Sequence, residues 1–132
     1  MSASLLAYHF DEKELKALRA LCRQKDVRLR AAKREDYFQP IGALCGREKR
    51  IEADPDAPEL AGQILVFADF PEKQFSAFYT FLRNAKLGQG ALKAMLTDTN
   101  AKWDAYTLLA QLTSEQAQIG EGVERAKAEK EQ

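Results

Sequence analysis

The residues best suited to binding chemistry lie between positions 92 and 103, in the sequence Leu-Lys-Ala-Met-Leu-Thr-Asp-Thr-Asn-Ala-Lys-Trp. Residues 97–100 (Thr-Asp-Thr-Asn) have short polar side chains that accept hydrogen bonds from the first free N–H groups of a helix. A helix N-terminus also attracts anions, because it carries partial positive charge. The segment therefore indicates a capped helix with Trp103 in the core or an anion site. Lys93 adds charge to that site if it points the same way.

A second polar corner, Glu-Asp-Tyr-Phe-Gln at residues 35–39, precedes Pro40. Two adjacent carboxylates on a loop diverge more often than they converge, so a catalytic pair is the minority interpretation. If internal symmetry relates the two corners, they face each other and form one site. The candidate ligand-binding residues are then Glu35, Asp36, Tyr37, Gln39, Lys93, Thr97, Thr99, Asn100 and Trp103.

Hydropathy patterns predict the elements that position these corners. Alternating residues predict strands at 5–10, 27–31 and 92–96, and the apolar run Ile64–Ala68 predicts a strand covered on both faces or lying in an interface. Asp11 caps a predicted helix that ends near residues 24–26, and a second helix begins near Pro71. Shorter helices are expected at 40–45 and from about 100 to 112.

The order strand, helix, strand, polar corner, helix occurs twice. Aligning Phe10–Arg23 with Phe70–Arg83 gives identical residues at five of fourteen positions. Aligning Val27 with Leu92 then places the apolar positions of strand 27–31 on those of strand 92–96. We therefore predict an α+β fold made of a duplicated β-α-β-α unit, with a ferredoxin-like four-stranded sheet and helices mainly on one face. The alternative is a mostly parallel α/β sheet covered on both faces.

These patterns predict a single domain at residues 1–112, with repeats at 5–46 and 64–112 joined by a linker at 47–63. Residues 113–132 are expected to form a helical, partly frayed C-terminal tail. No apolar run approaches the ~20 residues of a membrane helix, and no signal peptide is visible, which predicts a cytoplasmic protein. Cys22 and Cys45 are too few for a disulfide scaffold.

Charge and motif composition exclude several kinds of site. Twenty basic and twenty acidic residues cancel, so net charge gives no reason to expect nucleic acid or an acidic membrane. No Cys–His cluster has metal-ligand spacing and no glycine-rich phosphate loop is present, so neither a metal nor a cofactor is expected. His9, the only histidine, has no partner in the sequence and is expected to be a half-buried surface residue.

Basic residues are concentrated in Lys13–Arg34, which holds nine of them against two acidic residues. Such a run is usually a solvated helix face followed by an exposed strand face. It is also the kind of surface that binds nucleic acid. No aromatic residue interleaves with the arginines, which argues against RNA stacking. The residues of this weaker hypothesis are Arg28, Arg30, Lys33 and Arg34.

Two segments carry a family resemblance. One is Val27–Gly46, with Arg-Leu-Arg, Glu-Asp-Tyr, Gln-Pro and Gly-Ala-Leu. The other is Lys93–Trp103, with Lys-Ala-x-Leu-Thr-x-Thr-Asn-x-x-Trp. Together they resemble domain-of-unknown-function family 3783, a family of uncharacterised small bacterial proteins, over most of Leu5–Leu112. The resemblance implies one domain and a bacterial origin, and it supplies no activity, substrate or catalytic residue. Asp98 stands where proline is expected in the family.

The leading interpretation is a non-enzymatic binding or regulatory module that self-associates as a homodimer. No nucleophile–base pair is visible, and the apolar strand 64–68 with its phenylalanine-rich helix exceeds the needs of a one-sided sheet. The alternative is an anion or small-ligand site, or an enzyme, at the two corners. Nucleic-acid binding through residues 13–34 is the weaker alternative. The expected partner is a small ligand or a protein, and not a membrane.

Overall fold

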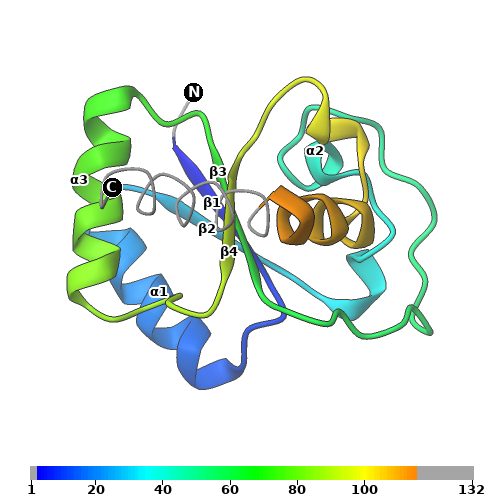
Figure 1. Ribbon diagram of the computed structural model, residues 1–132, viewed down its shortest axis with the longest axis horizontal. Coiled ribbons are helices and arrows are strands. Elements are labelled where there is room, and N and C mark those ends of the chain that lie inside the picture. Colours follow the sequence, from blue (N-terminus) through cyan, green and yellow to red (C-terminus); the bar gives the residue numbers. More distant parts are fainter. Residues whose placement is uncertain (1–2, 116–132) are drawn as a thin grey trace, which may run out of the picture.

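A four-stranded sheet runs through the centre of the molecule in the computed structural model, which describes residues 3–115 (Figure 1). All four predicted strands form, and residues 105–115 are helical. The elements in chain order are β1 (Ser4–Tyr8), α1 (Glu12–Gln24), β2 (Arg28–Ala32), η1 (Arg34–Asp36), α2 (Ile41–Leu44), β3 (Ile64–Ala68), α3 (Glu72–Asn84), β4 (Leu92–Met95) and η2 (Asn100–Lys102).

The sheet has the order β2-β1-β3-β4 and is mixed. The strands β1 and β2 are parallel, as are β3 and β4, whereas the central pair β1 and β3 is antiparallel. The α+β class is confirmed. The ferredoxin-like arrangement is not, because there each β-α-β unit is split by a strand of the other unit. Here each long helix returns the chain to the neighbouring strand. The alternative, a mostly parallel sheet covered on both faces, accounts for the two outer pairings and for the apolar layer on each face, but not for the antiparallel central pair. The prediction of helices mainly on one face was therefore wrong.

The long helices α1 and α3 cover one face of the sheet (Figure 1). Leu5 and Ala7 of β1 and Leu65 and Phe67 of β3 point into this layer, since alternate residues of a strand share a face. The Phe67 ring makes edge contacts with Phe70, Phe75 and Phe78, with centroids 5.5, 5.1 and 6.3 Å away. The α3 phenylalanines Phe75 and Phe78 therefore pack against the sheet of the same chain.

The opposite face is covered by α2, the linker and the helical residues 105–115, on the other side of the sheet in Figure 1. Both side-chain sets of β3 are buried, and the strand lies between two apolar layers. This confirms that the run Ile64–Ala68 is covered on both faces. The cover comes from the same chain, so the apolar strand no longer requires a second copy.

The last helix begins later than the predicted start at about residue 100. Residues 100–102 form a 3-10 turn, and Trp103 is extended with φ −86° and ψ 152°. Asp104 then caps the helix, because its Oδ1 accepts a hydrogen bond from the Thr107 N–H at 2.8 Å. The predicted cap at 97–100 was wrong, since those short polar side chains close their own turn instead.

The first strand and helix of each half have the same lengths and the same spacing along the chain. The alignment that places Phe10 on Phe70 also carries the bounds of β1 and α1 onto those of β3 and α3. It relates left-handed residues in pairs: His9 (φ 68°) with Asp69 (φ 61°), and Asp26 (φ 56°) with Lys86 (φ 58°). These non-glycine residues end the same strand and the same helix in each half.

The predicted alignment of the second strands, which places Leu29 on Ala94, is wrong. Leu29 pairs with Leu5, and Lys93 pairs with Leu65, which is the counterpart of Leu5 in the second half. Lys93 therefore corresponds to Leu29 and faces α3, whereas Ala94 faces the opposite layer. A one-residue error in register exchanges the faces of every side chain in a strand.

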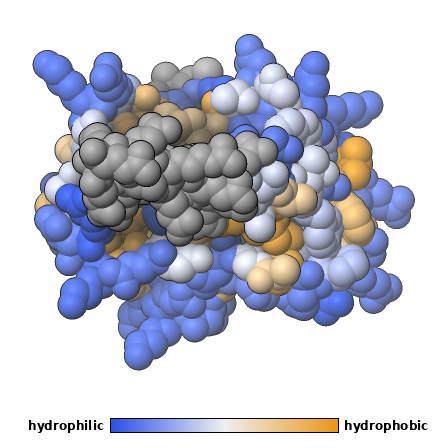
Figure 2. All heavy atoms as spheres, in the orientation of Figure 1, coloured by the Kyte–Doolittle hydropathy of each residue, from blue (hydrophilic) through white to orange (hydrophobic). Residues whose placement is uncertain are grey.

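Large apolar side chains that remain exposed come from several elements of the described part, namely Phe38, Ile51, Tyr79, Phe81 and Met95. Lys25 covers one of them, because its Nζ lies 3.7 Å from the centre of the Phe81 ring. Most atoms along the outline of the molecule in Figure 2 belong to hydrophilic residues. Within residues 3–115, no helix is long and apolar enough to cross a membrane. Of the predicted tail, 113–115 are helical and 116–132 lie outside the described residues.

We expect Tyr8→Phe to leave the free energy of unfolding unchanged or to raise it by about 1 kcal/mol. The Tyr8 side chain is fully buried, and its hydroxyl has no hydrogen-bond partner among the described residues. The matched variant Tyr106→Phe removes a hydroxyl that donates to the Pro58 carbonyl and should cost about 1 kcal/mol. Urea unfolding measures both. A clear loss for Tyr8→Phe would show that its hydroxyl is bonded, for example to a buried water.

Candidate functional site

The two polar corners cover the same face of the sheet and touch through their backbones. The Ile41 N–H donates to the Trp103 carbonyl at 2.8 Å, and the Ala105 N–H donates to the Tyr37 carbonyl at 3.1 Å. A Cβ placed on Gly42 would lie 2.9 Å from the Ala101 Cβ. The corners are therefore brought together by close packing, which leaves no space for a ligand between α2 and η2.

Side chains of the first corner, residues 35–39, form hydrogen bonds with the linker at 47–63. Gln39 is 1% exposed, and its amide bonds both the N–H and the carbonyl of Ile51, at 2.8 and 2.6 Å. Asp36 accepts hydrogen bonds from the Lys33 N–H at 3.2 Å and from Arg50 at 3.1 Å. These side chains replace the backbone partners that an irregular segment lacks.

Tyr37 and Glu35 complete this corner in different ways. The Tyr37 ring is buried and packs at 6.1 Å from the Tyr8 ring and 6.2 Å from the Tyr106 ring. The Glu35 side chain is exposed, and only its carbonyl is engaged, by the Asp54 N–H at 3.1 Å. No two carboxylates of this corner converge on a shared point, because Asp36 is turned towards Arg50.

The second corner is closed by Asn100. Its Oδ1 accepts from the Thr97 N–H at 2.8 Å, its Nδ2 donates to the Met95 carbonyl at 2.9 Å, and its N–H donates to Thr97 Oγ1 at 3.0 Å. Thr99 is exposed and caps nothing, and Trp103 is half-buried in the core. The donors expected to hold an anion are consumed within this turn.

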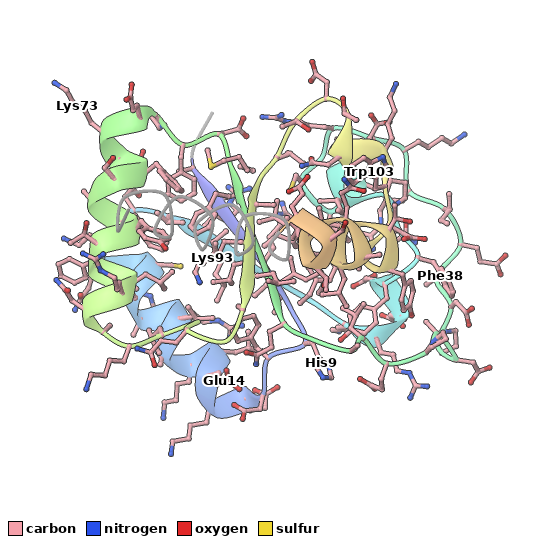
Figure 3. The ribbon with its side chains drawn as sticks, viewed as in Figure 1. His9, Glu14, Phe38, Lys73, Lys93 and Trp103 are labelled. Atoms are coloured by element: carbon pink, nitrogen blue, oxygen red, sulfur yellow. The ribbon has the colours of Figure 1, made fainter. Side chains whose placement is uncertain are left out.

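Lys93 lies on the opposite side of the sheet from Trp103 (Figure 3). It is separated from both corners because the register of β4 turns it towards α3. Its Nζ donates to the Gly88 and Ala91 carbonyls at 2.9 and 3.1 Å. The structure thus brings together eight of the nine candidate residues in one packed region and places Lys93 elsewhere.

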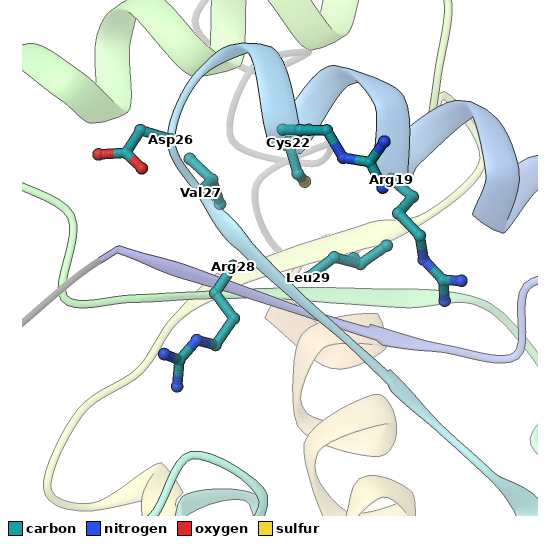
Figure 4. A pocket seen from close by; sticks show the side chains of 7 residues that line it. Arg19, Cys22, Asp26, Val27, Arg28 and Leu29 are labelled. Atoms are coloured by element: carbon teal, nitrogen blue, oxygen red, sulfur yellow. The ribbon is translucent and has the colours of Figure 1, made fainter.

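A better candidate surface lies at the edge of the sheet formed by β2. A hollow of about 440 Å³ runs between α1 and β2 (Figure 4). It is lined by three arginines, one carboxylate and three less polar residues, namely Arg19, Arg23, Arg28, Asp26, Cys22, Val27 and Leu29. Arg19 also lines a cleft of about 880 Å³ at the carboxyl ends of β1 and β2. We call this surface the basic edge and define it by Arg19, Arg23, Arg28, Arg30, Lys33 and Arg34.

The basic edge makes few ion pairs, although Asp26 lines its hollow and Asp11, Glu12 and Glu14 line the cleft. Within the described part of the chain, only Arg34 among the six makes an ion pair, at 3.7 Å from Glu59. Glu59 also lies 3.2 Å from His9 Nδ1. This partner of His9 could not be found in the sequence because it comes from the linker. Clustered charges of one sign raise the local concentration of oppositely charged partners.

The backbone of β2 adds a second feature to this surface. β2 pairs with β1 on one side only. The Arg28 N–H bonds inward to the Ala3 carbonyl at 2.9 Å, so the N–H groups of Leu29 and Ala31 point outward, because backbone directions alternate along a strand. Within residues 3–115, the basic edge therefore presents unpaired strand donors between two rows of cationic side chains.

Neither cysteine nor a metal cluster offers a reactive centre here. Burial raises the pKa of the Cys22 thiol to about 12 and also raises the pKa of Cys45, so both remain thiols at neutral pH. Residues 3–115 contain no group of three or more histidine, cysteine, aspartate or glutamate side chains that could hold a metal ion. The arrangement is suited to binding.

Asn100→Ala should lower the free energy of unfolding by about 1–3 kcal/mol, because it leaves the partly buried Thr97 N–H and Met95 carbonyl unpaired. Thr99→Ala, at the exposed neighbouring position, should change it by less than about 0.5 kcal/mol. Thermal and urea unfolding with and without inorganic phosphate measure the difference. Phosphate that stabilises the wild-type protein but not the Asn100→Ala variant would contradict a purely structural role and restore the anion site.

Comparison with known proteins gives one match. Residues 63–119 match the family model described as a domain of unknown function (DUF3783), which spans β3, α3, β4, η2 and the helix that begins at residue 105. No curated protein and no solved structure matches the chain. The match includes Lys93 and the second polar corner, whereas the basic edge lies outside it. Residues 63–119, which are less than half of the chain, therefore match this domain-of-unknown-function family.

Proposed function

We propose that the protein is a non-enzymatic interaction module that receives an acidic, extended peptide segment of a partner protein along β2. The observation that supports this proposal is an edge strand with free N–H groups, flanked by basic side chains of which five have no ion-pair partner in the described part. Proteins commonly bind peptides by adding a strand to such an edge. Backbone hydrogen bonds supply affinity, and flanking charges select the sequence.

The two sides of the edge are suited to alternate side chains of one strand. Arg19 and Arg23 lie on the α1 side of β2, whereas the Arg28 side chain points away from α1 (Figure 4). Arg30 lies two residues along the strand from Arg28, and residues separated by two share a face. A peptide paired with β2 therefore places alternate side chains beside Arg28 and Arg30, which favours carboxylates there. The side chains between them face the hollow, whose apolar residues favour apolar side chains.

A peptide fits this surface better than nucleic acid does. No aromatic side chain lines the hollow between α1 and β2, so bases have no stacking platform there. The outward N–H groups of Leu29 and Ala31 match the spacing of a strand. Overall charge is zero, so the chain lacks the general basicity that supports non-specific binding of nucleic acid.

A second copy of β2 is a poor occupant of the same edge. Pairing β2 with itself places arginines opposite arginines, and like charges directly opposite each other destabilise a sheet. The apolar strand at residues 64–68 no longer supports the homodimer predicted from the sequence, because both faces of β3 are buried within one chain. We therefore propose a heterologous partner.

We also infer an internal duplication as the origin of this edge. The single alignment that relates β1 and α1 to β3 and α3 supports it, as do the paired left-handed residues. In a duplicated fold the sheet has two equivalent edges, one at β2 and one at β4. The edge at β2 carries the arginines, which gives the two copies different partners.

Binding should be measured with a fluorescein-labelled peptide that alternates glutamate and valine, by fluorescence anisotropy. We expect saturable binding to the wild-type protein and at least a tenfold loss for Arg28→Glu/Arg30→Glu. The matched variant Lys13→Glu/Lys16→Glu changes net charge equally on exposed residues of α1 that do not line the hollow and should bind nearly as the wild type. An alternating lysine–valine peptide serves as the ligand control.

Ala31→Pro separates strand addition from simple charge attraction. It removes an outward N–H that the sheet does not use, and proline is tolerated on edge strands. Peptide affinity should fall at least tenfold while the circular dichroism spectrum remains unchanged. If Ala31→Pro binds the peptide as well as the wild type does, and single-stranded DNA competes at equal affinity, the proposal is wrong and the surface is a general polyanion site.

A further inference from the structure

A separate hollow of about 220 Å³ lies at the other edge of the sheet, between the last turns of α3, the 86–90 turn and β4. It occupies the place that the hollow between α1 and β2 has in the first half, because the alignment of α1 with α3 relates Cys22 to Leu82 and Arg23 to Arg83. The lining differs in character. Its residues are Tyr79, Leu82, Arg83, Leu87, Gln89 and Lys93.

The hollow combines an apolar body with cationic groups. Leu82 is 1% exposed and, with Leu87 and the Tyr79 ring, supplies apolar walls. Lys93 and Arg83 are the charged residues in the lining, and no carboxylate is present among the described lining residues. A neutral apolar ligand would leave these charges unmatched, whereas a ligand with an apolar part and one anionic group matches both features.

Lys93 has a donor available for such an anion. Its Nζ gives two N–H groups to the Gly88 and Ala91 carbonyls, at 2.9 and 3.1 Å, and an ammonium group has three. Burial lowers the pKa of Lys93, because it removes water from around the charge, and no carboxylate lines the hollow among the described residues. A bound anion would supply that missing interaction. The two carbonyls also hold the ammonium in a fixed position, which reduces the ordering cost of binding.

We propose that this hollow is a binding site for a small monocarboxylate with an aromatic or short aliphatic body. The carboxylate contacts the Lys93 ammonium, with Arg83 at the rim, and the apolar body lies against Leu82, Leu87 and Tyr79. The volume is below the ~300 Å³ at which drug-sized sites begin, which limits the ligand to roughly the size of benzoate. The site lies at the opposite edge from the basic edge and is independent of the proposed peptide binding.

Benzoate is the probe for this site, titrated into ¹⁵N-labelled protein while amide chemical shifts are recorded. We expect saturable shifts confined to α3, the 86–90 turn and β4. Benzamide, which has the same ring and no charge, should bind at least tenfold more weakly. Lys93→Met should reduce benzoate affinity at least tenfold. The control is Lys73→Met, because the Lys73 side chain points into solvent at the far end of α3 (Figure 3).

A direct measurement on the wild-type protein covers the case in which Lys93→Met does not fold. Benzoate should raise the pKa of Lys93, followed by the ¹⁵Nζ or ¹³Cε shift, because a neighbouring anion stabilises the ammonium. An unchanged pKa, equal affinity for benzamide, or undiminished binding to Lys93→Met overturns the proposal. The Arg28→Glu/Arg30→Glu protein should bind benzoate as the wild type does, so failure here is distinguishable from failure of peptide binding.

Discussion

The structure depends on burying both faces of the central antiparallel pair, β1 and β3. Every side chain of β3 is buried, and the apolar residues of β1 point alternately into the two layers. The long helices α1 and α3 cover only one face. The segments that follow β2 and β4, together with the linker, must cover the other, because a strand that is apolar on both faces is unstable with one face in water. The contact between the two polar corners follows from that requirement.

This requirement explains why several polar side chains of the two corners bond to the backbone of the chain itself. Segments without a regular hydrogen-bond ladder cover an apolar face only if their backbone groups find other partners. Gln39 supplies them for Ile51, and Asn100 supplies them for Thr97 and Met95. The same polar types that favour anion binding at a helix start are therefore consumed by the turns.

Unmatched charge collects where the fold does not need to bury it, at the two edges of the sheet. At β2 the charges are arginines on both sides of a free strand edge. At β4 they are Lys93 and Arg83 around an apolar hollow. Both edges consist of a helix beside an outer parallel strand, so their difference comes from side chains and from the longer turn between α3 and β4. The same arrangement thus presents an extended surface at one edge and a small, partly apolar hollow at the other.

The sequence alone determined the strands, the long helices, the two-faced burial of residues 64–68 and the cap at Asp11, whose Oδ1 accepts from the Glu14 N–H at 2.7 Å. These are local properties, set by side-chain periodicity and by contacts within one helical turn. Tertiary structure decided the strand order, the partner of His9 and the face on which Lys93 lies. The last depends on turn length, because seven residues separate α3 from β4 whereas three separate α1 from β2. Register follows from how such a turn packs against the sheet, which no local pattern records.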